Sequence, residues 1–231
     1  MEQQFTITTR KSSEYILIKF HKKEIIELTQ NGSIRMNSLS FYRDLYKNTN
    51  DENIGDPFEG KLYVHEADVL LNNQYFHLKD TAISTLTQDD FVYCMFGIKT
   101  SQIGQKFNFT EQHKRLWENE YDTALIITDT REFKNRLVTA ANELGYKLGA
   151  GFVIYYSPEE DCVERIISSI NNSCAAFFKR NCYSYQNEFR FRIANPNRKN
   201  FLDLNIGDIH DISETVDLKY FLKAYCEPID L

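Results

Sequence analysis

Residues 185–193 of the chain read YQNEFRFRI, a stretch in which apolar and polar side chains alternate. A period of two is typical of a β-strand, whose successive side chains point to opposite faces. One face of this predicted strand is mainly aromatic and aliphatic, and the other carries Gln186, Glu188, Arg190 and Arg192. The polar face is either an ordinary solvated surface of an antiparallel sheet or the floor of a binding site.

The rest of the chain supplies further strands, and fewer helices. Runs rich in β-branched and aromatic residues predict strands at 14–20, 34–36, 61–69, 74–78, 91–96, 124–127, 151–156 and 201–204. Helical spacing of apolar residues predicts helices at 21–30, 110–119, 130–144 and 159–170, the first ended by Asn31-Gly32 and the third capped by Thr130. Residues 218–225 fit a helix or a strand. Because strands and helices do not alternate one to one, we predict one α+β domain over residues 1–231. Its sheet is expected to be mixed, mainly antiparallel and flanked by helices.

The composition excludes several classes of protein. The chain has 231 residues, 42% of them hydrophobic, which suffices for a sizeable core. No run of about 18 apolar residues occurs, so we expect no membrane span. The first residues, MEQQF, lack the basic and apolar segments of a secretory signal. Five widely spaced cysteines without a C-x-x-C pair favour a reduced, cytoplasmic protein.

The net charge, the spacing of the histidines and the setting of Cys94 argue against three further kinds of site. The formal net charge of -6 argues against tight non-specific binding to nucleic acid. His65, His77, His113 and His210 lack the spacing of metal ligands, so we predict no metal site. Cys94 lies in an apolar run, where burial raises a thiol pKa and makes it a poor nucleophile.

The pair Gln186-x-Glu188 carries the most specific chemical signal. Residues two apart on a strand point to the same side and can meet one ligand. The pair resembles the Gln-x-Glu motif of ADP-ribosyltransferases, which lies on a strand of a split sheet. The resemblance implies NAD as substrate, with Glu188 stabilising the ribosyl oxocarbenium ion and Gln186 orienting the acceptor. It also implies an early His or Arg, for which His21 is the candidate. The run Cys94-Met95-Phe96-Gly97 departs from the family, because it stands where Ser-Thr-Ser is usual.

A second motif is GDPFEG at residues 55–60. Asp-Pro is a turn signal. With Gly32, Trp117 and the late Glu-x-Arg, the motif resembles a widespread bacterial family of uncharacterised function. That resemblance implies a pocket holding Arg43, Asp56, Glu59, Glu188 and Arg190.

These residues fit a pocket for a nucleotide. Arg43 and Arg190 are suited to bidentate contacts with phosphates. Tyr42 is suited to stacking on a base or on nicotinamide. The alternative is a buried salt-bridge cluster that ties the loop at 55–60 to the sheet.

The sequence thus leads to one main hypothesis and two others. The first is an NAD-dependent ADP-ribosyltransferase-like toxin or anti-phage effector, whose acceptor is a protein, a nucleic acid or water. In that case replacing Glu188 is expected to abolish turnover and leave the fold intact. The second is a non-enzymatic module that senses a nucleotide or binds a protein through the same pocket. The third is a metal-dependent nuclease, if Asp56, Glu59 and Glu188 converge.

Overall fold

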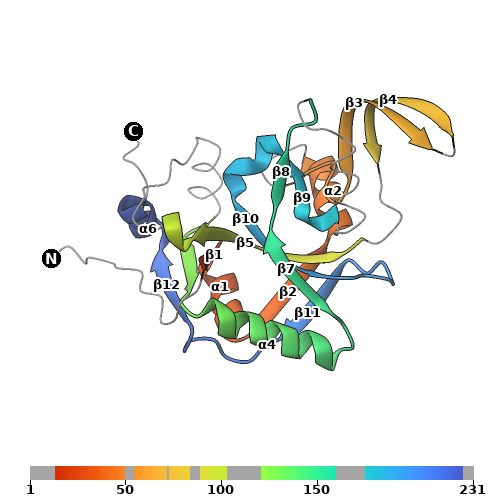
Figure 1. Cartoon of the computed structure of the whole chain (residues 1–231). Coiled ribbons are helices and arrows are strands. Elements are labelled where there is room, and N and C mark those ends of the chain that lie inside the picture. Colours follow the sequence, from red (N-terminus) through yellow and green to blue (C-terminus); the bar gives the residue numbers. More distant parts are fainter. Residues whose placement is uncertain are drawn as a thin grey trace.

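An eight-stranded antiparallel sheet forms the centre of the structure, a computed structural model of the whole chain (Figure 1). The structure describes residues 14–49, 55–71, 73–83, 89–102, 121–159 and 175–225. The strands of this sheet are β1 (Tyr15–His21), β2 (Ser33–Ser38), β5 (Phe91–Lys99), β6 (Thr123–Ile127), β7 (Leu148–Phe152), β10 (Glu188–Ile193), β11 (Phe201–Asn205) and β12 (Ser213–Asp217).

Smaller elements surround the sheet. Two more strand pairs are the antiparallel hairpin of β3 (Leu62–Leu71) with β4 (Gln74–Ile83) and the parallel pair of β8 (Ile154–Tyr156) with β9 (Phe178–Arg180). The helices are α1 (Lys23–Gln30), α2 (Leu39–Thr49), α4 (Thr130–Glu143) and α6 (Leu218–Tyr225), with short 3-10 turns η1 (Thr100–Gln102), η2 (Ala175–Phe177) and η3 (Asn181–Gln186). Figure 1 shows the β3–β4 hairpin projecting from one end of the molecule. The predicted α+β class with a mainly antiparallel sheet is therefore confirmed.

The sheet forks along one edge of β5. On this edge β1 pairs with the end of β5, up to Ile18 opposite Phe96. On the same edge β2 pairs with the start of β5, where Asn37 lies opposite Val92. The opposite edge of β5 pairs with β10 along its length, from Glu188 opposite Phe96 onward. Two branches, β1-β6-β12 and β2-β11, thus diverge from one strand.

Alternation along the strands gives the sheet two distinct faces. One face packs under α4 in the largest core cluster, which includes Leu17, Met95, Phe133, Phe189 and Phe191. The other face carries a second apolar cluster beneath α6, which includes Ile16, Ile18, Phe96 and Phe221. Beside it, on the same face, lie Val92 with Leu39 of α2 and Ala176 of η2. The polar side chains of β10 project into this second part.

The strand predictions were confirmed at every described run, with two differences in extent. The predicted strand at 151–156 is divided into β7 and β8, with Val153 between them. The predicted strand at 185–193 begins only at Glu188, because η3 occupies the preceding residues. The helix over 218–225 is α6, and β12 was not predicted.

The helix predictions need two corrections. Asp129, rather than Thr130, caps α4, because its carboxylate accepts the backbone N–H of Glu132 at 3.0 Å. Leu144, the last residue of the predicted helix, follows α4 as its exposed C-terminal cap. Helix α2 was missed, although Ser38 Oγ accepts the N–H of Phe41 at 3.2 Å and so provides an N-terminal cap.

Some predictions lie outside the described residues. These are the helix at 110–119 and nearly all of the helix at 159–170. Among the helices of the described ranges, none is long and apolar enough to cross a membrane.

The glycines that follow α1 and α4 provide a matched pair for testing how closely the backbone packs at one of them. Gly32 (φ +91°) and Gly145 (φ +77°) both adopt left-handed conformations. A Cβ on Gly32 would lie 2.3 Å from the carbonyl oxygen of Gly207, whereas a Cβ on Gly145 would meet nothing within 4 Å. Gly145→Ala is expected to lower the free energy of unfolding by about 1–2 kcal/mol, the usual cost of a left-handed L-residue. Gly32→Ala is expected to cost about 1–3 kcal/mol more through the backbone clash. Urea denaturation measures both, and equal losses would contradict the close approach of residues 32 and 207.

Candidate functional site

The start of β10 is set by a sharp backbone turn at Asn187. Its φ of 41° is left-handed and ends η3, which explains why the predicted strand does not reach Tyr185. Asn187 Nδ2 donates to the carbonyl of Gly97 at 2.6 Å, and the carbonyl of Asn187 accepts the Gly97 N–H at 2.9 Å. These bonds anchor the turn to β5. Gln186 therefore precedes the strand, and Glu188 is its first residue.

The polar face of β10 is buried rather than solvated. Glu188 is 8% exposed and Arg190 only 1%, whereas Arg192 is half-buried and pairs with Asp90 at 2.8 Å. The alternation of polar and apolar side chains was predicted correctly from Glu188 onward. The interpretation as a solvated surface was wrong, because α2, β9 and residues 55–60 cover this face.

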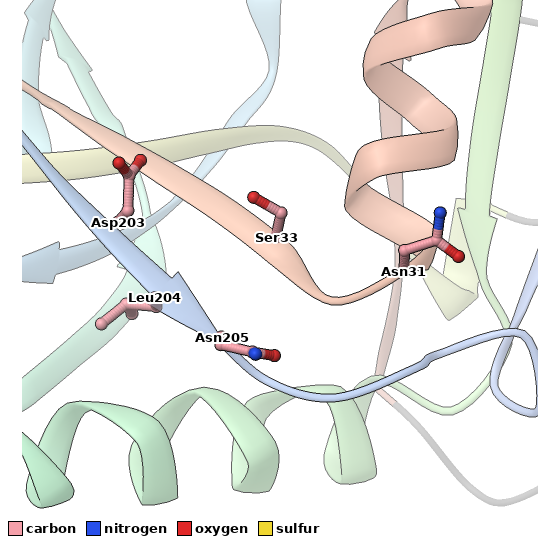
Figure 2. A pocket seen from close by; sticks show the side chains of 5 residues that line it. All are labelled: Asn31, Ser33, Asp203, Leu204 and Asn205. Carbon is pink, nitrogen blue, oxygen red and sulfur yellow. The ribbon is translucent and has the colours of Figure 1, made fainter.

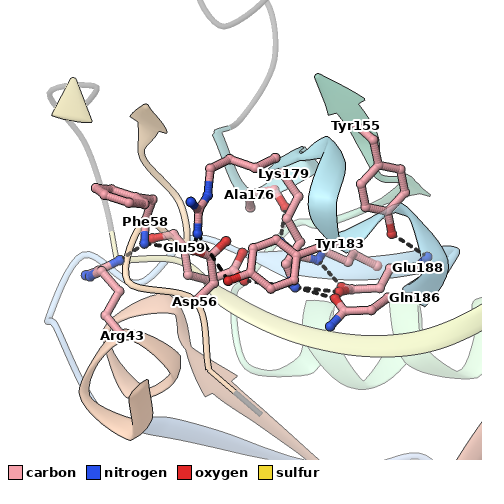
Figure 3. A network of polar contacts seen from close by, with 12 residues as sticks. Arg43, Asp56, Phe58, Glu59, Tyr155, Ala176, Lys179, Tyr183, Gln186 and Glu188 are labelled. Atoms are coloured by element: carbon pink, nitrogen blue, oxygen red, sulfur yellow. Dashed lines mark hydrogen bonds and ion pairs between the residues drawn. The ribbon is translucent and has the colours of Figure 1, made fainter. Parts of the chain in front are cut away.

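Four buried charged side chains, Glu59, Lys179, Glu188 and Arg190, form what we term the charge cluster (Figure 3). Arg190 Nε donates to Glu188 Oε2 at 2.6 Å, and its Nη1 donates to Glu59 Oε1 at 2.6 Å. The same Nη1 donates to the carbonyl of Ala176 at 2.5 Å. Lys179 Nζ lies 2.8 Å from Glu188 Oε1 and 3.4 Å from Glu59 Oε2. Two carboxylates and two cations thus balance within the cluster.

Glu59 reaches the cluster because the motif at 55–60 folds as a tight loop. Asp56 Oδ1 accepts the N–H of Phe58 at 2.9 Å, and the Asp56 carbonyl accepts the N–H of Glu59 at 3.1 Å. A Cβ on Gly55 would lie 2.5 Å from the backbone nitrogen of Tyr46, so only glycine lets this loop pack on α2. Arg43 of α2 donates to the Glu59 carbonyl at 2.5 Å. The predicted turn is confirmed.

A cation–aromatic stack borders the charge cluster. Arg180 Nη2 lies 3.3 Å from Asp56 Oδ1 and donates to the Tyr183 hydroxyl at 3.1 Å. Its guanidinium carbon lies 4.8 Å from the ring centre of Phe58, 5.3 Å from that of Tyr183 and 6.0 Å from that of Tyr63. Arg180, Phe58 and Tyr63 are half-buried, so the stack lies between the cluster and solvent.

The cluster fixes the ionisation of its members. Burial by itself raises a carboxyl pKa, yet Arg190 and Lys179 hold the pKa of Glu188 well below its usual range. Burial likewise lowers the pKa of an amine, but the charges of Glu188 and Glu59 raise the pKa of Lys179. At Asp56 burial and the nearby Glu59 carboxylate raise the pKa instead. Glu188 is consequently an anion at neutral pH.

Lys19 lies in the fork of the sheet. Its Nζ donates to the carbonyl of Cys94 at 2.8 Å, at the part of the β5 edge between the β1 and β2 pairings, and lies 4.8 Å above the Tyr93 ring. Burial lowers the pKa of this amine, although Glu188 is near enough to oppose the shift. Burial also raises the pKa of the Cys94 thiol to about 12, as expected for an inert cysteine.

Of the predicted site residues, His21 lies apart from the charge cluster, whereas Tyr42 lies beside Arg190 and Glu188. His21 packs against Tyr121, with ring centres 4.9 Å apart, and its Nδ1 accepts the N–H of Lys22. Burial and the charge of Lys19 lower the pKa of His21 to about 4. In the described part of the chain, no hydrogen bond or ion pair links His21 to the charge cluster. Tyr42 packs against the apolar group around Leu39, and burial raises its pKa.

The other predicted residues do come together. Glu59, Gln186, Glu188 and Arg190 meet directly or through Lys179. Asp56 is joined to Glu59 by a backbone hydrogen bond, and Arg43 joins at the edge. Glu59 and Glu188 converge on cations of the protein itself. Within the described ranges, no group of three His, Cys, Asp or Glu side chains is arranged to hold a metal ion.

Sequence reasoning missed three members of the site: Lys179, Tyr155 and Lys19. Tyr155 accepts the backbone N–H of Glu188 at 2.9 Å. Lys179 and Arg180 are adjacent basic residues, and nothing in their spacing links them to Glu188. Lys19 carried one usable signal, a lysine inside the apolar strand run at 14–20.

A hollow of about 220 Å³ lies elsewhere on the molecule (Figure 2). It is lined by Asn31, Ser33, Asp203, Leu204 and Asn205, where β11 pairs with β2. Asp203 is already bound to Arg35 through two hydrogen bonds of 2.8 and 3.1 Å. β5 separates the strands that line this hollow from β10 in the order of strands.

Comparisons with family models, with curated proteins and with solved structures found no match to this chain.

Burial of the charge cluster predicts large, pH-dependent stability losses. Glu188→Gln and Glu59→Gln each leave a buried cation short of a partner, so each is expected to lower the free energy of unfolding by about 3–5 kcal/mol at pH 7. Both carboxyls have lowered pKa values in the folded state. Their contribution is therefore complete above the ordinary Glu pKa of about 4.5 and is lost as the pH falls below it.

The measurement is urea denaturation of the wild type and both variants at pH 7 and at pH 3.5, where the differences should shrink. Asp203→Asn is the control, because its ion pair with Arg35 is exposed and is expected to contribute less than about 1 kcal/mol. Losses at pH 7 no larger than that of the control would contradict the buried cluster.

Proposed function

We propose that the chain acts on NAD in the manner of an ADP-ribosyltransferase, with Glu188 as the group that stabilises the ribosyl cation. One observation carries the proposal: Glu188 is kept ionised at the first position of β10, and Gln186 shares its Lys179 ammonium. A fixed anion beside an amide is the pair that the resemblance implies. It lies across β5 from the point where the sheet forks.

The proposed chemistry needs a negative charge fixed in place before the reaction. When the bond between nicotinamide and ribose breaks, its electron pair leaves with nicotinamide and positive charge develops on the ribose. An oriented carboxylate in a poorly hydrated site stabilises that charge without reorganising. Glu188 retains acceptor capacity for ribose hydroxyls, because a carboxylate has about four acceptor positions and its bonds to Lys179 and Arg190 use two of them.

The geometry divides the arginines between two roles. Arg190 donates to Glu59, Glu188 and a backbone carbonyl, which suits holding Glu188 rather than gripping a phosphate. Arg43 and Arg180 are half-buried at the rim of the cluster, with side chains 18% exposed. We therefore assign them the contacts with the pyrophosphate. Phe58 and Tyr63, beside Arg180, provide ring faces for a base.

A second candidate is a module that binds a nucleotide or a protein without catalysis. This candidate is favoured because the charges of the cluster already pair with one another, and both oxygens of Glu188 have cationic partners. Binding would then use the rim formed by Arg180, Phe58 and Tyr63, and would leave the cluster intact.

Nicotinamide release from NAD tests the enzymatic proposal. Glu188→Gln is used instead of Glu188→Ala, because removing a side chain from the buried cluster is now expected to destabilise the fold, contrary to our expectation from the sequence. The wild type is expected to release nicotinamide, and Glu188→Gln about 10²–10³-fold more slowly. Gly32→Ala, a destabilised variant whose site is unaltered, is the control and should retain activity where it is folded.

The two candidates predict different outcomes in the same samples. Full activity of Glu188→Gln would contradict the mechanism. No release by the wild type, together with a raised Tm in the presence of NAD or ADP-ribose, would favour the binding module. For a toxin or an anti-phage effector, expression of the wild type should arrest growth and expression of Glu188→Gln should not.

A further inference from the structure

Lys179 lies between the two residues proposed to carry the chemistry. Its Nζ donates to Gln186 Oε1 at 2.5 Å and to Glu188 Oε1 at 2.8 Å, and it lies 4.7 Å from the ring centre of Tyr183. Figure 3 shows these two bonds as dashed lines from the ammonium to adjacent oxygens of Gln186 and Glu188. Lys179 is 7% exposed and comes from β9, outside the main sheet.

The contact with Lys179 determines which way the Gln186 amide faces. An ammonium has three donors and no acceptor, so only the amide oxygen can lie against it. The amide nitrogen is therefore directed away from Lys179. Gln186 is half-buried, and in Figure 3 its nitrogen points out of the network. The site presents an N–H donor at this point, which suits an oxygen of the ligand or of the acceptor.

We infer that Lys179 is a positioning residue for the proposed reaction: one ammonium aligns Glu188 with Gln186 and turns the Gln186 amide N–H groups outward. The inference rests on the proposed function. Lys179 need not touch NAD, because its effect passes through the two side chains that it holds.

The inference has a consequence for pH dependence. Charged and titratable groups face Glu188 from each neighbouring element, namely Lys19 of β1, Glu59 of the loop at 55–60, Cys94 of β5, Tyr155 of β8, Lys179 of β9 and Arg190 of β10. Tyr42 of α2 and Tyr185 of η3 add hydroxyl groups whose pKa values are raised by burial. Between pH 2 and pH 8 the cysteine and the tyrosines are neutral because their pKa values are raised, and Lys179 stays charged because its pKa is raised as well. The charge of Glu188 in this range therefore depends chiefly on Lys179 and Arg190.

Removing the Lys179 charge should raise the pKa of Glu188. One close opposite charge typically lowers a carboxyl pKa by about 1–3 units, so Lys179→Met should reverse a shift of that size. Since the ionised form is the active one, activity should then fall off at a higher pH on the acidic side. A purely structural role for Lys179 would reduce the folded fraction and leave the acidic limb of the remaining activity in place.

The experiment compares nicotinamide release from pH 2 to pH 8 for the wild type, Lys179→Met and Lys179→Arg, because the lowered Glu188 pKa places the acidic limb of the wild type at low pH. The acidic limb of Lys179→Met is expected about 1–3 units above that of the wild type, and Lys179→Arg should restore the wild-type profile. Lys19→Met is the matched control, because this lysine is also near Glu188 but donates to a carbonyl. Its limb should move by less than that of Lys179→Met. An unmoved limb in Lys179→Met would overturn the inference.

A carbon NMR titration of Glu188, with the signal assigned from Glu188→Gln, tests the same inference without catalysis. If Lys179→Met does not fold, Lys179→Gln replaces it, because its amide can still bond Glu188 but carries no charge. A raised Glu188 pKa in Lys179→Met, together with a wild type that releases no nicotinamide, would support the positioning by Lys179 while the proposed function fails. An unchanged Glu188 pKa in an enzyme that does release nicotinamide would overturn the positioning alone.

Discussion

The Arg190 guanidinium, buried between the carboxylates of Glu59 and Glu188, is the interaction on which the rest of the structure depends. Its donors reach β10 itself, the loop at 55–60 and the carbonyl of Ala176 in η2. One side chain thereby ties two peripheral segments to the central sheet. A guanidinium at 1% exposure requires such partners, because an unpaired buried charge is very costly. The loop, η2 and the sheet must therefore assemble together.

Joining a loop to a sheet through buried charges carries a large desolvation cost. Desolvating four charges offsets much of their mutual attraction, and well-packed apolar side chains of similar volume often stabilise a protein equally well. The location of the cluster fits a role in function rather than in stability alone. It lies on the strand opposite the fork of the sheet, and it holds Glu188 ionised beside Gln186. A carboxylate prepared in this way is what the proposed cleavage of NAD requires.

The sequence predicted those parts of the fold that depend on local patterns. The apolar run at 91–96 predicted β5, the Asp-Pro turn signal predicted the loop at 55–60, and Asn31-Gly32 predicted the end of α1. The possible pairing of Arg190 with Glu59 or Glu188 was also foreseen, as a salt-bridge cluster. The sequence alone did not decide between a solvated and a buried polar face, because burial depends on segments far away in the chain. Lys179 was missed because β9 is only three residues long and pairs in parallel with β8. The break at Asn187 did leave a signal, since asparagine is one of the few residues besides glycine that are enriched at left-handed φ values.

A crystal structure of Glu188→Gln with NAD is the measurement that tests the central claim most directly. The account predicts that the nicotinamide ribose lies within hydrogen-bonding distance of residue 188 and near Gln186, with the pyrophosphate toward Arg43 or Arg180. NAD bound elsewhere, for example in the hollow between Asn31 and Asp203, would contradict it. NAD that contacts only the rim formed by Arg180, Phe58 and Tyr63, and not residue 188, would also contradict it.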